Sequence, residues 1–197
     1  KLLNNNTKNM EKFQNRFRIP SARANWHDYN GGIYFVTICT KNREHYFGEI
    51  CTGPQMQLSQ IGQYAYDQFI NVKTHYPYAK IPLFVIMPDH IHAIVTIDGE
   101  NDTCRDVVRN VSTPARNVST RVNTQMANIS PRKNSLAVVI RGVKSSITKF
   151  ANENNIPFAW QSRFHDRIIR NQDEFDKISD YIEKNVVNWQ NDMGNIK

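Results

Sequence analysis

The stretch 33–40 constrains the fold more than any other part of the sequence. Its side chains are β-branched, aromatic or otherwise apolar at almost every position. Successive side chains of a strand point to opposite faces of its sheet, so this stretch presents apolar groups on both faces. The sequence therefore predicts an interior strand that is buried above and below.

Two further strands are expected to form a hairpin. Residues 83–87 and His90–Ile97 are apolar and rich in β-branched side chains, and only the short corner Pro88-Asp89 separates them. Strands joined by so short a link pair antiparallel. A fourth strand is predicted at 164–170, and Gly48, Gly53 and Pro54 mark a turn region after the first.

Three helices are predicted between and after these strands. Ser59 and Ser135 are good N-caps for the first two, and the first runs to about His75. Asn171, with Glu174 three residues later, is typical of the start of a third helix that runs to about Trp189. Each helix carries an apolar stripe at helical spacing. The stripes are Ile61, Ala65, Phe69 and Val72; Leu136, Val139, Ile140, Val143, Ile147 and Phe150; and Phe175, Ile178, Ile182, Val186 and Trp189.

The order strand, helix, strand, strand, helix, strand, helix predicts the fold class. Strands in this order form an antiparallel sheet with helices packed on it, the ferredoxin-like α+β pattern. The predicted domain spans 31–189, after a basic N-terminal arm at 1–30 and before a short tail at 190–197. Residues 99–134 lack apolar periodicity and contain the duplicated sequence Arg-Asn-Val-Ser-Thr, which indicates an insertion that is disordered or a functional loop.

Charge and cysteine content limit the function classes. The formal net charge of +7 favours a polyanion as partner. The odd set Cys39, Cys51 and Cys104 contains no Cys-x-x-Cys pair, which argues against a disulfide framework or a cysteine-built zinc site. The sequence opens without the apolar region of a signal peptide, and no apolar run is long enough to span a membrane. We therefore expect a cytoplasmic protein without a membrane partner.

His90 and His92 form the sharpest local signal. Strand alternation puts both imidazoles on one face, while Ile91 and Ala93 point to the other. Two imidazoles that point the same way from an interior strand can chelate a divalent metal. The alternative is a pair of core histidines that are bonded to backbone or water. Two buried imidazoles are costly to satisfy separately, so we favour the metal interpretation.

Tyr181 and Asn185 form the second signal. They lie one turn apart at the margin of the apolar stripe of the last helix, so a phenol and an amide point toward the sheet. An inward amide needs a polar partner, and a metal held by His90 and His92 provides one. The alternative is that Tyr181 packs in the ordinary way and that Asn185 lies near a frayed helix end.

Together the two signals predict phosphodiester chemistry. A free tyrosine hydroxyl has a pKa of about 10 and is a poor nucleophile unless it is activated. A divalent cation in contact with the scissile phosphate stabilises the charge that grows in the transition state. Tyr181 can then attack phosphorus and store the bond as a phosphotyrosine ester.

Four motifs closely resemble those of the single-tyrosine HUH transposases, above all the REP-associated tyrosine transposases. They are Gly-Ile-Tyr-Phe-Val-Thr at 32–37, Met-Pro-Asp-His-Ile-His at 87–92, Trp-Gln-Ser-Arg-Phe-His-Asp-Arg-Ile-Ile at 160–169 and Tyr-Ile-Glu-Lys-Asn at 181–185. The resemblance runs from about Asn25 to Trp189, apart from the insertion. Each motif is weak alone, but their order and spacing are specific.

The resemblance implies a ferredoxin-like fold, Mg²⁺ or Mn²⁺ as cofactor, and hairpin-bearing single-stranded DNA as substrate, such as a REP-like element or an insertion-sequence end. It implies cleavage that leaves a 5′-phosphotyrosine and a free 3′-OH. By motif position, His90 and His92 bind the metal, Tyr181 is the nucleophile and Asn185 is a third polar ligand. The resemblance leaves monomer and homodimer open.

Basic side chains are candidates for contacts with the DNA backbone, with a solvated surface as the alternative. In the domain they are Lys144, Lys149, Arg163, His165, Arg167 and Arg170; in the arm they are Arg16, Arg18 and Arg23, beside the aromatic residues Trp26 and Tyr29. His165 either approaches the site or pairs with Asp166.

Two rival functions remain open. One is a non-catalytic ferredoxin-like module that binds single-stranded nucleic acid, and the other is a metal phosphodiesterase that acts on small nucleotides and has no need of Tyr181.

Overall fold

A four-stranded antiparallel sheet forms the centre of the computed structural model. The structure describes residues 27, 29–51, 55–99 and 133–189, and the backbone alone at 12–13, 16–17 and 190–194. The strands are β3 (Gly32–Cys39), β6 (Ala79–Ile86), β7 (His90–Ile97) and β8 (His165–Ile169), in the order β6-β7-β3-β8. Neighbouring strands are antiparallel throughout. This sheet confirms the predicted ferredoxin-like α+β fold class, with the apolar strand and the histidine strand at its centre.

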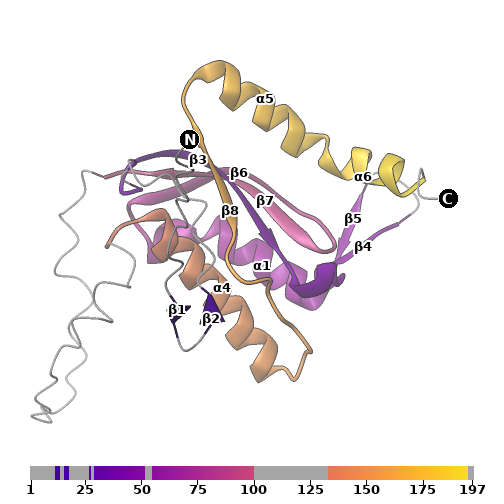
Figure 1. Cartoon of the computed structure of the whole chain (residues 1–197). Helices are drawn as coiled ribbons and strands as arrows, with labels where there is room; N and C mark the ends of the chain where they lie inside the picture. The colour runs from indigo at the N-terminus through magenta and orange to yellow at the C-terminus, as the bar shows by residue number, and fades with distance from the viewer. Residues whose placement is uncertain are drawn as a thin grey trace, which may run out of the picture.

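Helices lie on both faces of the sheet (Figure 1). On one face are α1 (Gln60–Ile70), α2 (Val72–His75) and α4 (Leu136–Glu153). Across the other face runs α5 (Gln172–Glu183), which α6 (Asn185–Gly194) continues.

The two-sided apolar pattern of β3 is explained by this arrangement. Tyr34 and Val36 are fully buried in the core beneath α1 and α4. Ile33 and Phe35 point the other way and pack with Ile182 of α5. The prediction of an interior strand covered on both faces is therefore confirmed.

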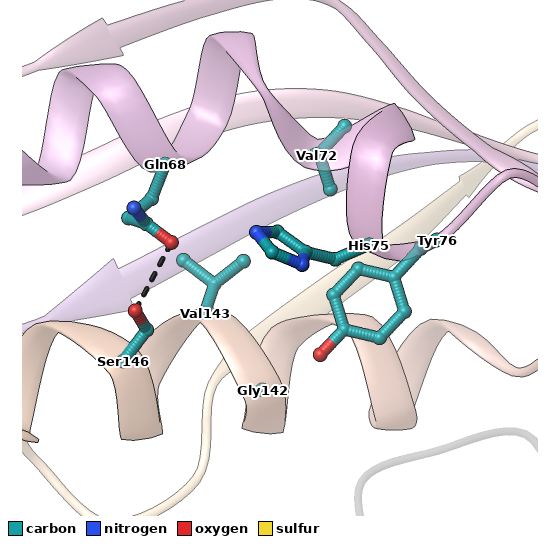
Figure 2. A pocket seen from close by; sticks show the side chains of 7 residues that line it. All are labelled: Gln68, Val72, His75, Tyr76, Gly142, Val143 and Ser146. Carbon is teal, nitrogen blue, oxygen red and sulfur yellow. Dashed lines mark hydrogen bonds between the residues drawn. The ribbon is translucent and has the colours of Figure 1, made fainter. Parts of the chain in front are cut away.

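A few specific contacts join α1 and α4 (Figure 2). Ser146 Oγ of α4 donates a hydrogen bond of 3.0 Å to Gln68 Oε1 of α1. Gly142 leaves room for the ring of Tyr76, because a Cβ at Gly142 would overlap with the Tyr76 hydroxyl. A hollow of about 340 Å³ remains between the helices, and His75 is among the residues that line it.

The first predicted helix begins where expected but is divided. Ser59 is its N-cap, and the side chain accepts a hydrogen bond of 3.1 Å from the backbone N–H of Gly62. The helix breaks at Asn71, between α1 and α2, rather than running unbroken to His75. The Asn71 amide donates to the carbonyl of Asp67 (2.9 Å), in the way that asparagine side chains compete with helical hydrogen bonds.

Two other expectations were incomplete. The strand predicted at 83–87 begins at Ala79 and includes Pro82, at a shift in register between Lys80 and Leu83. β6 is an edge strand, and a proline at such an irregularity need not remove a ladder hydrogen bond. The region predicted as a turn contains an antiparallel pair, β4 (Gly48–Ile50) and β5 (Met56–Leu58). A short 3₁₀ helix, η1 (Lys41–Arg43), leads into it from β3.

The last predicted helix is likewise two helices, separated at Lys184. Asn171 caps α5 as predicted, since its Oδ1 accepts from the backbone N–H of Glu174 at 2.8 Å. Lys184 keeps helical dihedral angles, and its backbone N–H and C=O bond to Asp180 and Asn188. The chain therefore continues in nearly the same direction from α5 into α6, which carries Asn185 to the same side as Tyr181.

Several predicted segments lie partly or wholly outside the described residues. Within the arm, the backbone of β1 (Lys12–Phe13) pairs antiparallel with β2 (Arg16–Phe17). Most of the predicted insertion, residues 100–132, and the last tail residues, 195–197, are outside the description. In the part of the chain that is described, no helix has the length and apolar character that a membrane crossing requires.

Candidate functional site

His90 and His92 project from β7 toward α5 and α6. Ile91 and Ala93 point to the opposite face and belong to the core beneath α1 and α4, as strand alternation predicts. The row of side chains continues across the sheet, because His92 lies opposite Thr37 of β3 and Thr37 lies opposite His165 of β8.

The two imidazoles converge through the same ring nitrogen. His90 Nε2 lies 3.0 Å from His92 Nε2. The other nitrogens face supporting groups: His90 Nδ1 is 2.6 Å from Asp89 Oδ1, and His92 Nδ1 is 2.9 Å from Thr37 Oγ1. Histidines that bind metals are usually held in this way, with one nitrogen on the metal and the other on a carboxylate or hydroxyl.

The hydrogen bonds also indicate which nitrogen of each ring carries a proton. The Asp89 carboxylate only accepts, so His90 Nδ1 donates and His90 Nε2 presents a lone pair. His92 Nε2 then donates to that lone pair, and His92 Nδ1 accepts from the Thr37 hydroxyl. For both Nε2 atoms to bind one cation, the His92 proton must move to Nδ1. Thr37 Oγ1 can then accept a hydrogen bond from the N–H at Nδ1, because a hydroxyl is both a donor and an acceptor.

Burial keeps His92 neutral. Removal from water, reinforced by His90 and by the Arg43 cation, lowers the pKa of His92 from 6.5 to about 3, against the opposing effect of Asp89. A neutral imidazole is the form that binds metal ions. The site therefore keeps His92 neutral, as metal binding requires, throughout the physiological pH range.

Tyr181 and Asn185 lie over this pair. The Tyr181 hydroxyl is 3.3 Å from His92 Nε2, and its ring packs edge-on against Phe35 and His92. The Tyr181 residue is 45% exposed, so its hydroxyl is within reach of a large substrate. Asn185 is only 7% exposed, and no hydrogen bond joins its side chain to another described residue. Asn185 lines the cavity beside the histidines, where its amide is open to a ligand.

A cavity of about 500 Å³ joins these groups. Its lining residues are Thr37, Arg43, His90, His92, Tyr181, Asn185, Asn188 and Trp189. The four residues that the sequence singled out for chemistry thus share one cavity. Within the described residues, no group of three or more His, Cys, Asp and Glu side chains could hold a metal ion. A cation at the histidines would therefore need Asn185 and oxygen atoms from outside the protein.

Sequence reasoning missed the residues that support the site. The buried Asp89 carboxylate, which is 3% exposed, lies between His90 Nδ1 and Arg43 Nε, with 2.8 Å to the guanidinium. Trp189 covers His90, with 5.7 Å between the ring centroids. The acidic residue directly before His-x-His was a usable signal for Asp89. The contribution of Arg43 had no local signal, because it depends on how η1 meets the corner at Pro88-Asp89.

Three of the predicted DNA-binding residues, Lys144, Lys149 and Arg167, make side-chain contacts within the protein. Lys144 is half-buried, and its Nζ donates to the carbonyls of Gln161 and Arg163 at 2.9 Å each. Burial lowers its pKa, and we infer that it anchors this segment instead of contacting DNA. Lys149 and Arg167 form ion pairs of 3.7 Å with Glu153 and 3.1 Å with Glu174, while the side chains of Arg163 and Arg170 are exposed.

His165 is exposed on the same face as His92, two strands away, which is about 10 Å at ordinary strand spacing. His165 is exposed and Asp166 is half-buried, as expected for neighbouring strand residues that point to opposite faces. A pair between them stays an untested alternative.

The arm is only partly described. Tyr29 is half-buried and stacks on Tyr34, with 5.4 Å between ring centroids, so one face of its ring packs within the protein. Arg18, Arg23 and Trp26 lie outside the described residues, and Arg16 is described only by its backbone in β2.

Comparisons with known proteins agree with this fold. No protein-family model matches the chain. Among solved structures, the chain has the fold of a REP-associated tyrosine transposase that was determined bound to a REP hairpin, with a TM-score of 0.51 and 20% identity over 84% of this chain and 74% of that one. The fold and the histidine–tyrosine cavity thus define a protein of transposase-like fold. A protein of Haemophilus influenzae, described as uncharacterized, is 31% identical over 175 residues, which is 88% of this chain and 91% of that protein. The chain belongs to the same family as this Haemophilus protein.

Proposed function

We propose that the protein is a metal-dependent endonuclease and strand-transferase of the HUH tyrosine-transposase type, which acts on hairpin-bearing single-stranded DNA. One observation carries the proposal: the Tyr181 hydroxyl lies 3.3 Å from His92 Nε2, which in turn lies 3.0 Å from His90 Nε2. The three groups come from one chain, so the proposal needs no second copy to complete the site.

The residues fit a divalent cation. The two Nε2 atoms converge, their Nδ1 atoms are held by Asp89 and Thr37, and the amide of Asn185 lines the same cavity without a hydrogen bond to another described residue. His90, His92 and Asn185 would hold the ion. Two imidazoles suit Mn²⁺ better than Mg²⁺, because Mg²⁺ prefers carboxylate and water oxygens in a strict octahedron. When bound, the cation would polarise the scissile phosphate.

The chemistry assigned to Tyr181 is an in-line displacement at phosphorus. The phenolic oxygen forms a bond to phosphorus, and the bond from phosphorus to the 3′-oxygen breaks. The phenolic proton leaves to solvent along the exposed side of the ring, and the departing 3′-oxygen takes up a proton to give a free 3′-OH. The 5′-phosphotyrosine keeps the energy of the phosphodiester, so a 3′-OH can reverse the step without ATP.

The substrate class rests on charge and on the structural neighbour. A net charge of +7 favours a polyanion, and the transposase of the same fold was determined with a REP hairpin. Tyr181 lies over an open cavity, where a flexible single strand can bring a phosphate to the hydroxyl more easily than a paired duplex.

A gel experiment tests the function. The protein is incubated with Mn²⁺ and a labelled DNA in which a hairpin is flanked on both sides by randomised single strands. We expect a covalent adduct on a denaturing gel, lost in Tyr181→Phe and abolished by chelation. Tyr66→Phe is the matched control, since Tyr66 is an exposed tyrosine on α1. Cleavage without an adduct points instead to a hydrolytic phosphodiesterase, and binding without cleavage points to a non-catalytic module.

A further inference from the structure

A second concave surface adjoins the histidine cavity. Its volume is about 690 Å³, and its lining residues are Lys41, Asn42, Arg43, Ala159, Trp160, Gln161 and Ser162. Arg43 lines both cavities. We call this surface the Arg43 groove, and none of its lining residues is acidic.

The two walls of the Arg43 groove are fixed to each other. One wall is η1 and the other is the segment 159–162. The backbone N–H of Lys41 donates to the carbonyl of Ala159, and that of Gln161 donates to Cys39, at 2.9 Å each. Lys144 holds the second wall from below through its bond to the Gln161 carbonyl. A groove with walls fixed in this way can bind a ligand without first being ordered, which lowers the cost of binding.

Arg43 is aimed at the junction of the two cavities by an uncommon backbone conformation. Asn42 and Arg43 both have positive φ angles, 55° and 60°, in the left-handed region that non-glycine residues seldom adopt. The Arg43 Nε forms an ion pair of 2.8 Å with Asp89 Oδ2, and its Nη1 donates a hydrogen bond to Cys39 Sγ. Its Nη2 has no partner in the described part of the chain, and half of the side chain is exposed. A guanidinium held on one edge and open on the other is suited to a phosphate.

We propose that the Arg43 groove binds the nucleotide next to the scissile phosphate, so that the single strand passes from the histidine cavity across Arg43. This inference rests on the proposed function and adds the path of the strand to it. Arg43 and Lys41 contact backbone phosphates, and the base lies against Ala159 and the edge of Trp160. The occupant is a nucleotide because the groove combines two cations with an apolar wall and opens into a site proposed for phosphate chemistry.

Salt dependence of binding tests the phosphate contacts. The full chain carrying Tyr181→Phe binds a fluorescent oligo-dT strand, and the dissociation constant is measured by anisotropy at several salt concentrations. Lys41→Gln and Arg43→Gln should each lower the log–log salt slope by about 0.7, the value for one phosphate on a single strand. Lys73→Gln removes an exposed charge from α2, on the other side of the sheet, and should leave the slope unchanged.

A blocking substitution tests the groove itself. Ser162 is exposed, so Ser162→Tyr fills the groove without disturbing the core. We expect about tenfold weaker binding of oligo-dT, from the loss of one stacked base, with unchanged affinity for Mn²⁺.

The outcomes separate the two proposals. If the wild-type protein forms the Tyr181 adduct but Lys41→Gln, Arg43→Gln and Ser162→Tyr bind oligo-dT as the parent does, the groove inference is overturned and the function stands. If the wild-type protein neither binds single strands nor forms an adduct, both are overturned.

Discussion

Acid should destabilise the metal-free protein through His92. The folded protein holds the pKa of His92 at about 3, whereas an unfolded chain binds a proton near the ordinary value of 6.5. Below pH 6.5 the unfolded state therefore takes up a proton that the folded state refuses. The stability linked to His92 is complete above pH 6.5 and is lost as the pH falls toward 3.

The size of this effect follows from the shift. One pKa unit corresponds to about 1.4 kcal/mol, so lowering the pH from 7 to 5 should reduce the free energy of unfolding by about 2 kcal/mol through this residue. Solvent screens this effect little, because His92 is only 6% exposed.

Urea denaturation with a chelator present, at pH 7 and at pH 5, measures the effect. His92→Gln removes the titrating group while keeping a polar side chain of similar size. The drop in unfolding free energy between the two pH values should be about 2 kcal/mol smaller in His92→Gln than in the wild type. His75→Gln changes an exposed histidine on α2 and should behave as the wild type does. An equal drop in His92→Gln and wild type would refute the reasoning.

Two further predictions concern support of the fold and of the site. Gly62→Ala should lower the free energy of unfolding by about 2 kcal/mol, because the added Cβ would overlap with the Phe47 carbonyl. This cost outweighs the helix preference of alanine over glycine, which is about 1 kcal/mol. Urea denaturation measures the change, and an alanine at the exposed Gln63 should have little effect. Asp89→Asn should weaken Mn²⁺ binding by about 10- to 100-fold in calorimetry, since a neutral amide holds the His90 ring less well. An unchanged Mn²⁺ affinity in Asp89→Asn would mean that His90 is not a ligand supported by this carboxylate.

The sequence predicted the main residues of the candidate site. Alternation along β7 put His90 and His92 on one face, and the helical period put Tyr181 and Asn185 on one side of the last helix. Both are local properties, fixed by the geometry of a strand and of a helix. Neither pattern contains the distance between the two elements, which is set by the sheet order and by the packing of Ile182 against Ile94.

The sequence by itself determined the order of the four strands of the central sheet and of the three helical regions, the two-sided burial of β3 and the caps at Ser59 and Asn171. These follow from periodicity and from side-chain hydrogen bonds to nearby backbone, which act over a few residues. Only the tertiary structure decided that Arg43 forms an ion pair with Asp89 and that Lys144 bonds to the carbonyls of Gln161 and Arg163. The same packing joins the histidine cavity to a second groove. Such contacts arise between segments far apart in the chain, and the periodic pattern of either segment does not indicate which other segment it will contact.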